Sequence, residues 1–202
     1  MTDTTCHLSV SLDGYVAGPD QSRTNGLGIG GQELHHWHLG DPRATEADRI
    51  AESWLMRPRG AYLMGRNMFG PIRGDWDEPW TGWWGDEPPY HAPVFVLTHH
   101  PHEPIEMAGG TTFHFVTEGF GAAYARAVAA ADGGGVDIAG GAATVRQALA
   151  ADVIDELVLD IAPVLLGAGE RLFDGVDRFG FEPVEALHSP LATHVRYRRT
   201  AR

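Results

Sequence analysis

The chain of 202 residues carries 27 acidic and 15 basic side chains, a formal net charge of -12, with 43% hydrophobic and 21% charged residues. This composition fits one soluble globular domain over residues 1–202, and the negative charge disfavours binding to nucleic acid or to an anionic membrane surface. Cys6 is the one cysteine, which excludes an internal disulfide and a cysteine-rich zinc site and favours a reducing, cytoplasmic location.

The first quarter of the chain predicts a strand, a long loop and a helix. Residues 7–12 alternate apolar and polar side chains and stop at Asp13-Gly14, as a strand entering a turn does. The loop from residue 13 to about residue 31 is rich in Gly, Pro, Asn and Asp, and so long a connection is more often functional than idle. Residues 45–56 then place apolar side chains on one helical stripe behind a capping box. The opening residues lack a basic stretch and a long apolar core, so we expect neither a signal peptide nor a membrane anchor there.

A tryptophan-rich segment lies between two further predicted strands, residues 61–64 and residues 94–98. Residues 75–93 carry four of the six tryptophans among prolines, glycines and acids, which excludes a regular element. The segment is either a surface loop pinned by aromatic packing or an aromatic wall around a flat ligand. On the second interpretation, a planar substrate would meet Trp80, Trp84 and Tyr90.

Alternating strands and helices follow. Residues 113–116 predict a strand, residues 120–131 an alanine-rich helix, and residues 136–139 a strand that runs into Gly140-Gly141 and a second helix. This alternation favours an α/β fold with a largely parallel sheet.

The C-terminal part of the chain reads as β structure. Residues 156–166 form a long apolar run in which Pro163 suggests an edge strand or a bulge. Residues 179–187 and 193–200 look like an antiparallel hairpin, which would place antiparallel strands at one edge of the sheet.

Three predicted strand ends are suited to binding phosphate. In open parallel sheets, ligands bind beyond the carboxyl ends of the strands, where helices begin with unpaired N–H groups. A glycine pair at a helix start lets a phosphate approach the main chain, although glycine there also serves simply to turn the chain. Taken singly, Arg66 could be a surface ion-pair partner, and His99 or His100 a solvated loop residue; together the corners fit a dinucleotide. The three corners are Gly65, Arg66 and Asn67; Thr98, His99 and His100; and Gly140, Gly141, Ala142, Ala143 and Thr144.

Six stretches covering nearly the whole chain resemble the dihydrofolate reductase superfamily, in the branch of the RibD C-terminal reductase-like domain, also called the bifunctional deaminase-reductase C-terminal domain. The resemblance implies a dihydrofolate reductase-like three-layer α/β/α fold, with a mostly parallel mixed sheet and antiparallel C-terminal strands. It also implies a homodimer. The stretches are SLDGYVAGPD (11–20), YLMGRNMFG (62–70), PVFVLTHHP (93–101), TTFHFV (111–116), IAGGAATVRQAL (138–149) and DELVLDIAPVLLGAGERLF (155–173).

The same resemblance implies that NADPH lies across the strand ends. Val16 and Ala17, in the loop after the first strand, would cover the nicotinamide. Residues Gly65 to Met68 and Thr98 to His100 would hold the adenosine phosphates, and Gly140 to Thr144 the pyrophosphate. The zinc-deaminase pattern of H-x-E and P-C-x-x-C does not occur, so only the reductase half and no metal site are expected.

The implied reaction is hydride transfer from NADPH to a small, planar heterocyclic or conjugated carbonyl substrate, as in riboflavin biosynthesis. Asp13, where the first strand meets the covering loop, is the catalytic residue favoured as proton donor, although Asp before Gly is also a common turn-former. His35, His36 and His38 are further candidates. The alternative is a non-catalytic protein that keeps the fold and binds NADPH as a sensed ligand.

Overall fold

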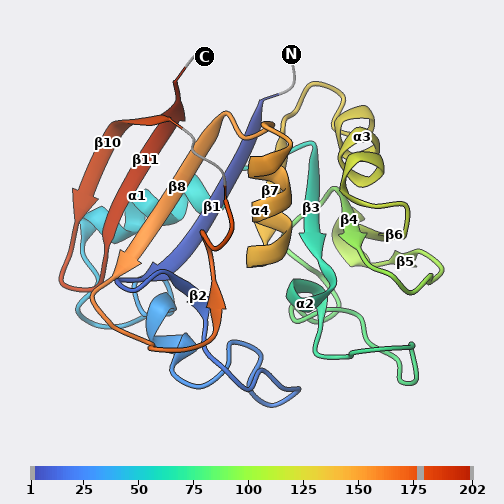
Figure 1. The fold of residues 1–202 in the computed structure, drawn as a ribbon, viewed down its shortest axis with the longest axis horizontal. Coiled ribbons are helices and arrows are strands. Elements are labelled where there is room, and N and C mark those ends of the chain that lie inside the picture. Colours follow the sequence, from blue (N-terminus) through green and yellow to red (C-terminus); the bar gives the residue numbers. More distant parts are fainter. Residues whose placement is uncertain (1–2, 177–179, 201–202) are drawn as a thin grey trace. The chain divides into compact units, whose positions relative to one another are not determined.

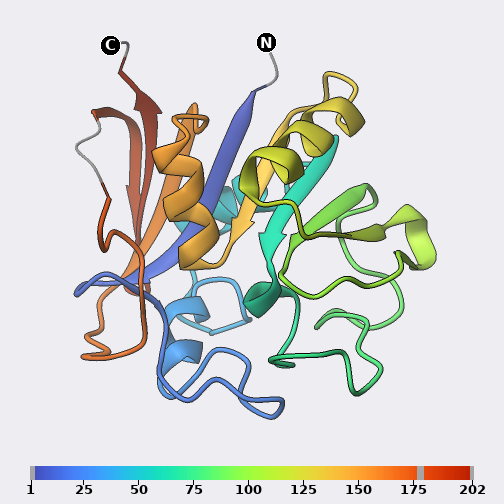
Figure 2. The ribbon, with the colours of Figure 1, turned by 45° about the vertical axis from the view of Figure 1, so that its right-hand side comes forward.

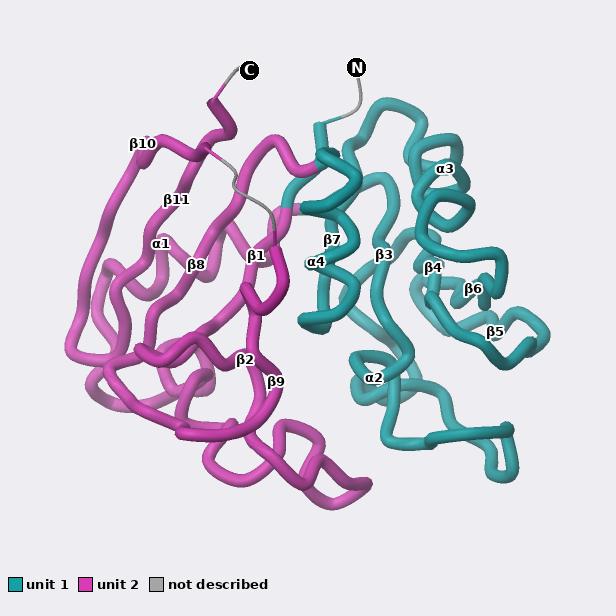
Figure 3. Tube along the Cα trace, viewed as in Figure 1, with its two compact units in different colours: residues 1–5, 58–153 teal, residues 6–57, 154–202 magenta. Residues whose placement is uncertain are grey.

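The computed structural model describes residues 3–176 and 180–200, and its contacts divide the chain into two compact units (Figure 3). Unit 1 comprises residues 1–5 and 58–153, and unit 2 comprises residues 6–57 and 154–202. Strand β1 (Thr4–Ser11) contributes its first two residues to unit 1 and the rest to unit 2.

Unit 1 is built on a mostly parallel sheet (Figure 1). All its strand pairs are parallel except β5 with β6, and Thr4 and Thr5 of β1 pair in parallel with β7. Its apolar strands are buried along most of their length, as expected for parallel strands covered by helices. The strand order is β7 (Val136–Gly140), β3 (Ala61–Gly65), β4 (Pro93–Leu97), β6 (Thr112–Val116) and β5 (Ile105–Glu106).

The helices of unit 1 follow its strands directly. Helices α3 (Phe120–Ala130) and α4 (Ala142–Ala150) pack against β3 and its neighbours (Figure 2). A one-turn helix, α2 (Arg66–Phe69), begins where β3 ends, and a short 3-10 turn, η2 (Ala108–Gly110), precedes β6. The predicted order of strands and helices is confirmed over this unit, whereas β5, α2 and η2 had no clear signal in the sequence.

Unit 2 carries the antiparallel strands. The strand order is β10 (Phe181–His188), β11 (Thr193–Arg199), β8 (Glu156–Ala162) and β1, and both β10–β11 and β11–β8 are antiparallel. The C-terminal hairpin is therefore confirmed; Phe179, which the prediction included, lies outside the described residues.

The expectation that Pro163 marks an edge strand or a bulge is wrong. Strand β8 has β11 and β1 as its two neighbours, so it is not an edge, and it ends at Ala162. Proline has no N–H to donate to a ladder, and the strand stops just before it.

The remaining elements of unit 2 surround the loop that follows β1. Strand β2 (Tyr15–Ala17) pairs with β9 (Glu170–Arg171), and η1 (Gly31–His35) ends the long loop. Helix α1 (Glu46–Leu55) begins with the predicted capping box, in which the Thr45 N–H donates to the Asp48 carboxylate over 2.6 Å.

Candidate functional site

The carboxyl end of the parallel sheet in unit 1 brings the three predicted phosphate corners together. In the β3–β7 pair Met64 lies opposite Gly140, and in the β3–β4 pair Gly65 lies opposite Leu97. The chain segments that leave β3, β4 and β7 therefore start side by side at one edge of the sheet. This is the place where an open α/β sheet binds its ligand.

Helix α4 begins at this edge with its N-terminus unobstructed. Gly141 is the N-cap residue, and a β-carbon built on it would meet no atom within 4 Å, so the space in front of the first N–H groups is open. The Gly140–Gly141 peptide bond is cis. Gly65 instead supports close packing, because a β-carbon there would lie 2.5 Å from the Thr144 hydroxyl oxygen. An anion fits at such a helix start, where the dipole and the unpaired N–H groups favour negative charge.

Arg66 is the cation of this edge. Its side chain is only 9% exposed, and its Nε and Nη2 have no hydrogen-bond partner among the described residues. The guanidinium carbon lies 3.8 Å from the centre of the Trp76 ring, and burial lowers the pKa of Arg66. A buried cation with unused N–H groups calls for an anion, so Arg66 is not a surface ion-pair residue.

The corner after β4 is held by short-range hydrogen bonds. The His100 N–H donates to the Thr98 hydroxyl oxygen over 3.1 Å, and the His100 Nδ1 lies 2.9 Å from an Asp75 carboxylate oxygen. His99 and Asn67 are exposed, and Met68 is half-buried. Their contacts with a cofactor stay predictions.

The tryptophan-rich segment packs on the core of its own unit. The Trp80 Nε1 donates to the Phe69 carbonyl oxygen over 2.9 Å, and the Tyr90 ring packs edge-to-face with Tyr62. Burial raises the pKa of Tyr90 to about 12. Trp84 is 54% exposed. These contacts favour a loop pinned by aromatic packing, and substrate binding by Trp80, Trp84 and Tyr90 stays a prediction.

In unit 2, the Asp13 carboxylate binds the loop that follows β8. Its two oxygens accept the N–H groups of Leu166 and Gly167 over 3.1 and 2.7 Å, and one of them also accepts the Ser11 hydroxyl. The Ser11 hydroxyl and the backbone donors together lower the pKa of Asp13 to about 2. An ionised carboxylate has no proton to give at neutral pH, so these contacts favour a bracing role over the predicted catalytic one. Val16 and Ala17 lie in β2.

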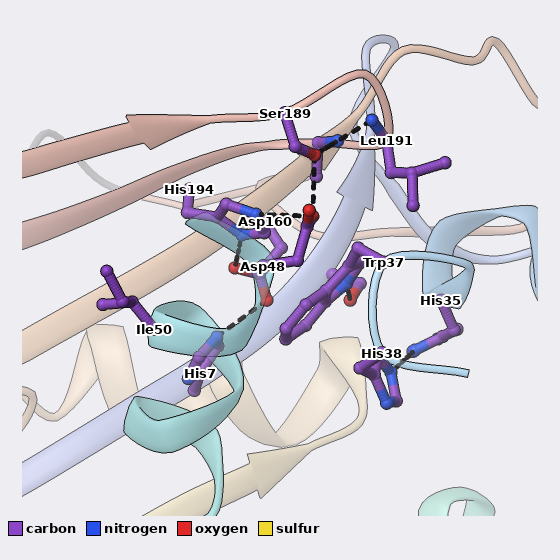
Figure 4. Close-up of polar contacts among 12 residues, drawn as sticks. His7, His35, Trp37, His38, Asp48, Ile50, Asp160, Ser189, Leu191 and His194 are labelled. Carbon is purple, nitrogen blue, oxygen red and sulfur yellow. Dashed lines mark hydrogen bonds and ion pairs between the residues drawn. The ribbon is translucent and has the colours of Figure 1, made fainter. Parts of the chain in front are cut away.

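A buried network of carboxylates and imidazoles connects four elements of unit 2 (Figure 4). One Asp160 oxygen lies 2.7 Å from the His7 Nε2, and the other lies 2.7 Å from the His194 Nδ1. The His194 Nε2 lies 3.2 Å from an Asp48 oxygen, which also accepts the Ser189 hydroxyl over 2.7 Å. Asp48, Asp160 and His194 are each at most 1% exposed.

Within this network, the pKa values of the two carboxyl groups are lowered and the pKa of His194 is raised. Burial alone would raise the pKa of both carboxyls, but hydrogen bonds and the imidazoles outweigh it, so the pKa values of Asp48 and Asp160 lie below their usual range. Burial alone would lower the pKa of His194, but its two carboxylate partners raise it. Opposed shifts of this kind are frequent at functional sites.

Sequence reasoning did not find this network. One signal was present, because Asp160 is the one charged residue inside the apolar stretch LVLDIAP. Its partners come from β1, α1 and β11, which are distant in the chain, so no local spacing reveals them.

The described residues contain neither a cluster suited to a metal ion nor a helix suited to span a membrane. Over residues 3–176 and 180–200, no group of three or more His, Cys, Asp or Glu side chains is placed to hold a metal ion. None of the helices in the described part of the chain has the length and apolar character needed to cross a membrane.

Comparisons with known proteins agree with this architecture. The family model described as the RibD C-terminal domain matches residues 4–189. A crystal structure of a putative riboflavin biosynthesis protein from Shewanella sp. PV-4 is 25% identical, with a TM-score of 0.68 and complete coverage of both chains. A search of curated proteins gave no match.

Two further structures share the fold. The Thermotoga maritima diaminohydroxyphosphoribosylaminopyrimidine deaminase/5-amino-6-(5-phosphoribosylamino)uracil reductase is 14% identical, with a TM-score of 0.58, over 98% of this chain and 57% of that one. Enterococcus faecalis dihydrofolate reductase, complexed with NADP(H) and RAB-propyl, is 17% identical, with a TM-score of 0.58, over 98% of this chain and 97% of that one. The predicted dihydrofolate reductase-like α/β fold with a mostly parallel mixed sheet is confirmed.

Proposed function

Because the chain belongs to the family of RibD C-terminal domains, we propose that it is a reductase that uses NADPH to reduce a small planar heterocycle or conjugated carbonyl compound. The structural relatives named above include a uracil-type reductase and a dihydrofolate reductase with bound NADP(H). Their names give as substrates a phosphoribosylaminouracil and dihydrofolate, each of which contains a nitrogen heterocycle, and this supports the substrate class.

The observation that carries the proposal is the unpaired, buried guanidinium of Arg66 beside the open start of α4. NADPH carries a diphosphate and one further phosphate, so it needs two anion sites a short distance apart. The backbone N–H groups of residues 141–143 fit the diphosphate, whereas the Thr144 N–H already donates to the Gly141 carbonyl oxygen over 3.0 Å. Arg66 with the Thr98–His100 corner fits the additional phosphate.

When bound, NADPH supplies the hydride, and the protein's own groups orient the two reactants and exclude water. The predicted roles of Val16 and Ala17 at the nicotinamide belong to this proposal. Asp13 is left out of the proton step, because its carboxylate is ionised and engaged with two backbone N–H groups.

The proposal is tested in two steps. NADPH and NADH are titrated into the purified protein, and we expect NADPH to bind more tightly because only NADPH carries the phosphate that Arg66 would meet. Loss of NADPH absorbance is then followed with 5-amino-6-(5-phosphoribosylamino)uracil, dihydrofolate and a panel of conjugated carbonyl compounds. Absence of NADPH binding would overturn the cofactor assignment.

Binding without turnover would support the second candidate, a protein that senses NADPH without catalysis. One observation favours it: Arg66 has buried, unpaired N–H groups that could bind a cofactor phosphate, whereas the predicted acid Asp13 has no proton to give. Steady NADPH consumption with any acceptor rejects this alternative.

Two further properties belong to the proposal. We expect a homodimer in the cytoplasm that binds a small-molecule substrate and no nucleic acid, in keeping with the net charge of -12 and the single cysteine. Light scattering on the purified protein measures the oligomeric state.

A further inference from the structure

Two carboxylates accompany the guanidinium of Arg66 at the predicted phosphate site of unit 1. Asp75 and Asp77 flank Trp76 in the chain, and the guanidinium carbon of Arg66 lies 3.8 Å from the centre of the Trp76 ring. Burial and the charge of Arg73 lower the pKa of Arg66, whereas the charges of Asp75 and Asp77 raise it. The positive charge of Arg66 is therefore partly offset by negative side chains of its own unit.

Asp75 is the carboxylate that contacts the corner after β4. Its Oδ1 lies 2.9 Å from the Nδ1 of His100. The carbonyl oxygen of His100 accepts the Trp76 Nε1–H over 3.0 Å, and the His100 N–H donates to the Thr98 hydroxyl oxygen. Asp75 is thus connected to this corner through its side chain, and through its backbone to the ring that stacks on Arg66.

The cation and the carboxylate of this site differ in their exposure to solvent. Arg66 is only 9% exposed, and its Nε and Nη2 have no hydrogen-bond partner among the described residues. These two nitrogens share one edge of the planar guanidinium, and that edge can hold two oxygens of one phosphate side by side. The Asp75 side chain is 96% exposed, so a ligand can meet it without displacing other side chains. A phosphate bound by Arg66 feels the charge of Asp75, which acts over about 8–10 Å at physiological salt.

NADPH and NADH differ only at the 2′ oxygen of the adenosine ribose, which carries a phosphate in NADPH and a hydrogen in NADH. In dinucleotide-binding folds, an arginine accommodates this phosphate and a carboxylate accepts the hydroxyl. A carboxylate also repels the phosphate, because a phosphate monoester carries about -1.5 to -2 charges at pH 7. Arg66 therefore favours NADPH, and a carboxylate beside it favours NADH.

We propose that Asp75 is a specificity-determining residue, which lowers the preference of the Arg66 site for NADPH over NADH by repelling the 2′-phosphate and accepting the 2′-hydroxyl. The inference rests on the proposed function, in which Arg66 meets the additional phosphate of NADPH. The protein then binds both cofactors, and NADPH leads by a smaller margin than Arg66 alone would give. Every side chain in this site belongs to unit 1.

Asp75→Asn is the decisive variant, because it removes the charge and keeps the shape of the side chain. The asparagine carbonyl oxygen can still accept the His100 Nδ1–H, so the corner after β4 keeps its hydrogen bond. At low ionic strength, we expect the Kd of NADPH to fall about three- to tenfold, as the repulsion of the phosphate is lost. The Kd of NADH should rise about two- to fivefold as the hydroxyl loses a charged acceptor. The readout is the ratio of the two Kd values, since a general change at the site moves both in one direction.

Asp86→Asn is the matched control. Asp86 is an exposed carboxylate in the same tryptophan-rich segment, but its carbonyl oxygen accepts the Ala108 N–H over 3.0 Å, which places it beside η2. This variant changes the net charge of -12 by the same amount as Asp75→Asn. It should leave the ratio of the Kd values as in the wild type. An equal gain of NADPH affinity in both variants would overturn the proposal and assign the effect to net charge.

Adenosine fragments test the same site without the nicotinamide. Adenosine 2′,5′-bisphosphate carries the additional phosphate of NADPH, whereas adenosine 5′-monophosphate has the free hydroxyl of NADH. We expect Asp75→Asn to bind the bisphosphate more tightly by the same factor as NADPH. Salt at about 1 M, which screens charges beyond about 3 Å, should remove this gain. A gain that persists at 1 M salt would come from altered packing and would overturn the proposal.

The possible failures are distinguishable. If the wild type binds neither NADPH nor adenosine 2′,5′-bisphosphate, the cofactor assignment fails and the role of Asp75 fails with it. If the wild type binds both and Asp75→Asn leaves the ratio of the Kd values unchanged, the cofactor assignment stands and Asp75 does not set specificity. If Asp75→Asn does not fold, as judged by circular dichroism, Asp75→Ser, which also removes the charge at this exposed position, takes its place in the same measurements.

Discussion

The guanidinium carbon of Arg66 lies 3.8 Å from the centre of the Trp76 ring, within the distance of a cation–π contact. The Trp76 Nε1 donates to the carbonyl oxygen of His100 over 3.0 Å, which fixes the ring. Stacking covers one face of the guanidinium and leaves the N–H groups in its plane free to bind. Trp76, which had no role of its own in the sequence analysis, therefore holds the Arg66 guanidinium in place at the predicted phosphate site.

This arrangement predicts that Arg66→Lys weakens NADPH binding. Lysine cannot stack on Trp76 in the same way and offers no planar fork for a phosphate. Loss of charge-assisted hydrogen bonds worth about 1.5–3 kcal/mol raises the Kd of NADPH roughly 10- to 150-fold. NADH affinity should hardly change. Isothermal titration of both cofactors measures the two effects.

Arg73→Lys is the control for this measurement. Arg73 lies in the same unit, and its Nη1 donates to the Gly70 carbonyl oxygen at an exposed position. The control should bind NADPH within about twofold of the wild type. If both variants lose the same amount of NADPH affinity, the Arg66 guanidinium does not bind the phosphate specifically.

Gly141→Val separates the phosphate and turn interpretations of the glycine pair. The φ angle of Gly141 is -75°, and a β-carbon there meets nothing within 4 Å, so a side chain at this position begins in open space. Its side chain would fill the space in front of α4. We expect the free energy of unfolding to change by less than about 0.5 kcal/mol and the Kd of NADPH to rise at least tenfold.

Gly121→Ala is the matched control for the glycine experiment. Gly121 also has open space around its α-carbon but lies inside helix α3, away from the strand ends. This variant should stabilise the helix slightly and leave NADPH affinity unchanged. If Gly141→Val loses folding stability along with NADPH affinity, the glycine pair serves as a structural turn and not as a phosphate site.

How far the sequence could predict the molecule depends on the range of the interactions. The strands of unit 1 and the capping box of α1 were predictable, because apolar periodicity and the Thr45–Asp48 spacing are local signals. The phosphate corners followed from the rule that ligands meet the carboxyl ends of parallel strands. The partners of Asp160 were not predictable, because His7 and His194 reach it from 153 and 34 residues away.

The buried network predicts a pH window of stability. The raised pKa of His194 gives stability that is complete below its ordinary value of 6.5 and is lost as the pH rises through the folded value. The lowered pKa values of Asp48 and Asp160 give stability that is complete above 3.8 and is lost as the pH falls through the folded values. The full contribution of the network therefore lies between about 3.8 and 6.5.

His194→Gln tests this window. Removing one partner leaves buried carboxylates uncompensated, so we expect a loss of about 3–5 kcal/mol at pH 6. The difference from the wild type should shrink as the pH rises above 6.5, because the wild-type imidazole loses its extra proton as the pH passes through its raised, folded-state pKa. Urea unfolding of both proteins across this range gives the difference directly. A difference that stays constant with pH would mean that His194 is neutral throughout.

Asp13→Asn decides between the bracing and the catalytic role of Asp13. The carboxylate accepts two backbone N–H groups at once, those of Leu166 and Gly167, whereas an asparagine amide has one oxygen and turns its NH2 towards the second donor. We therefore expect faster hydrogen exchange at the Leu166 and Gly167 amides and a lower melting temperature. The contribution of the Asp13 carboxylate to wild-type stability is present above the ordinary pKa of 3.8 and is lost towards pH 2, so the stabilities of wild type and variant should converge in acid.

The pH–rate profile gives the second test of Asp13→Asn. Because an ionised group does not donate a proton, the descending limb of the pH–rate profile should be the same in both proteins. A shifted limb with unchanged amide exchange would instead restore Asp13 as the acid.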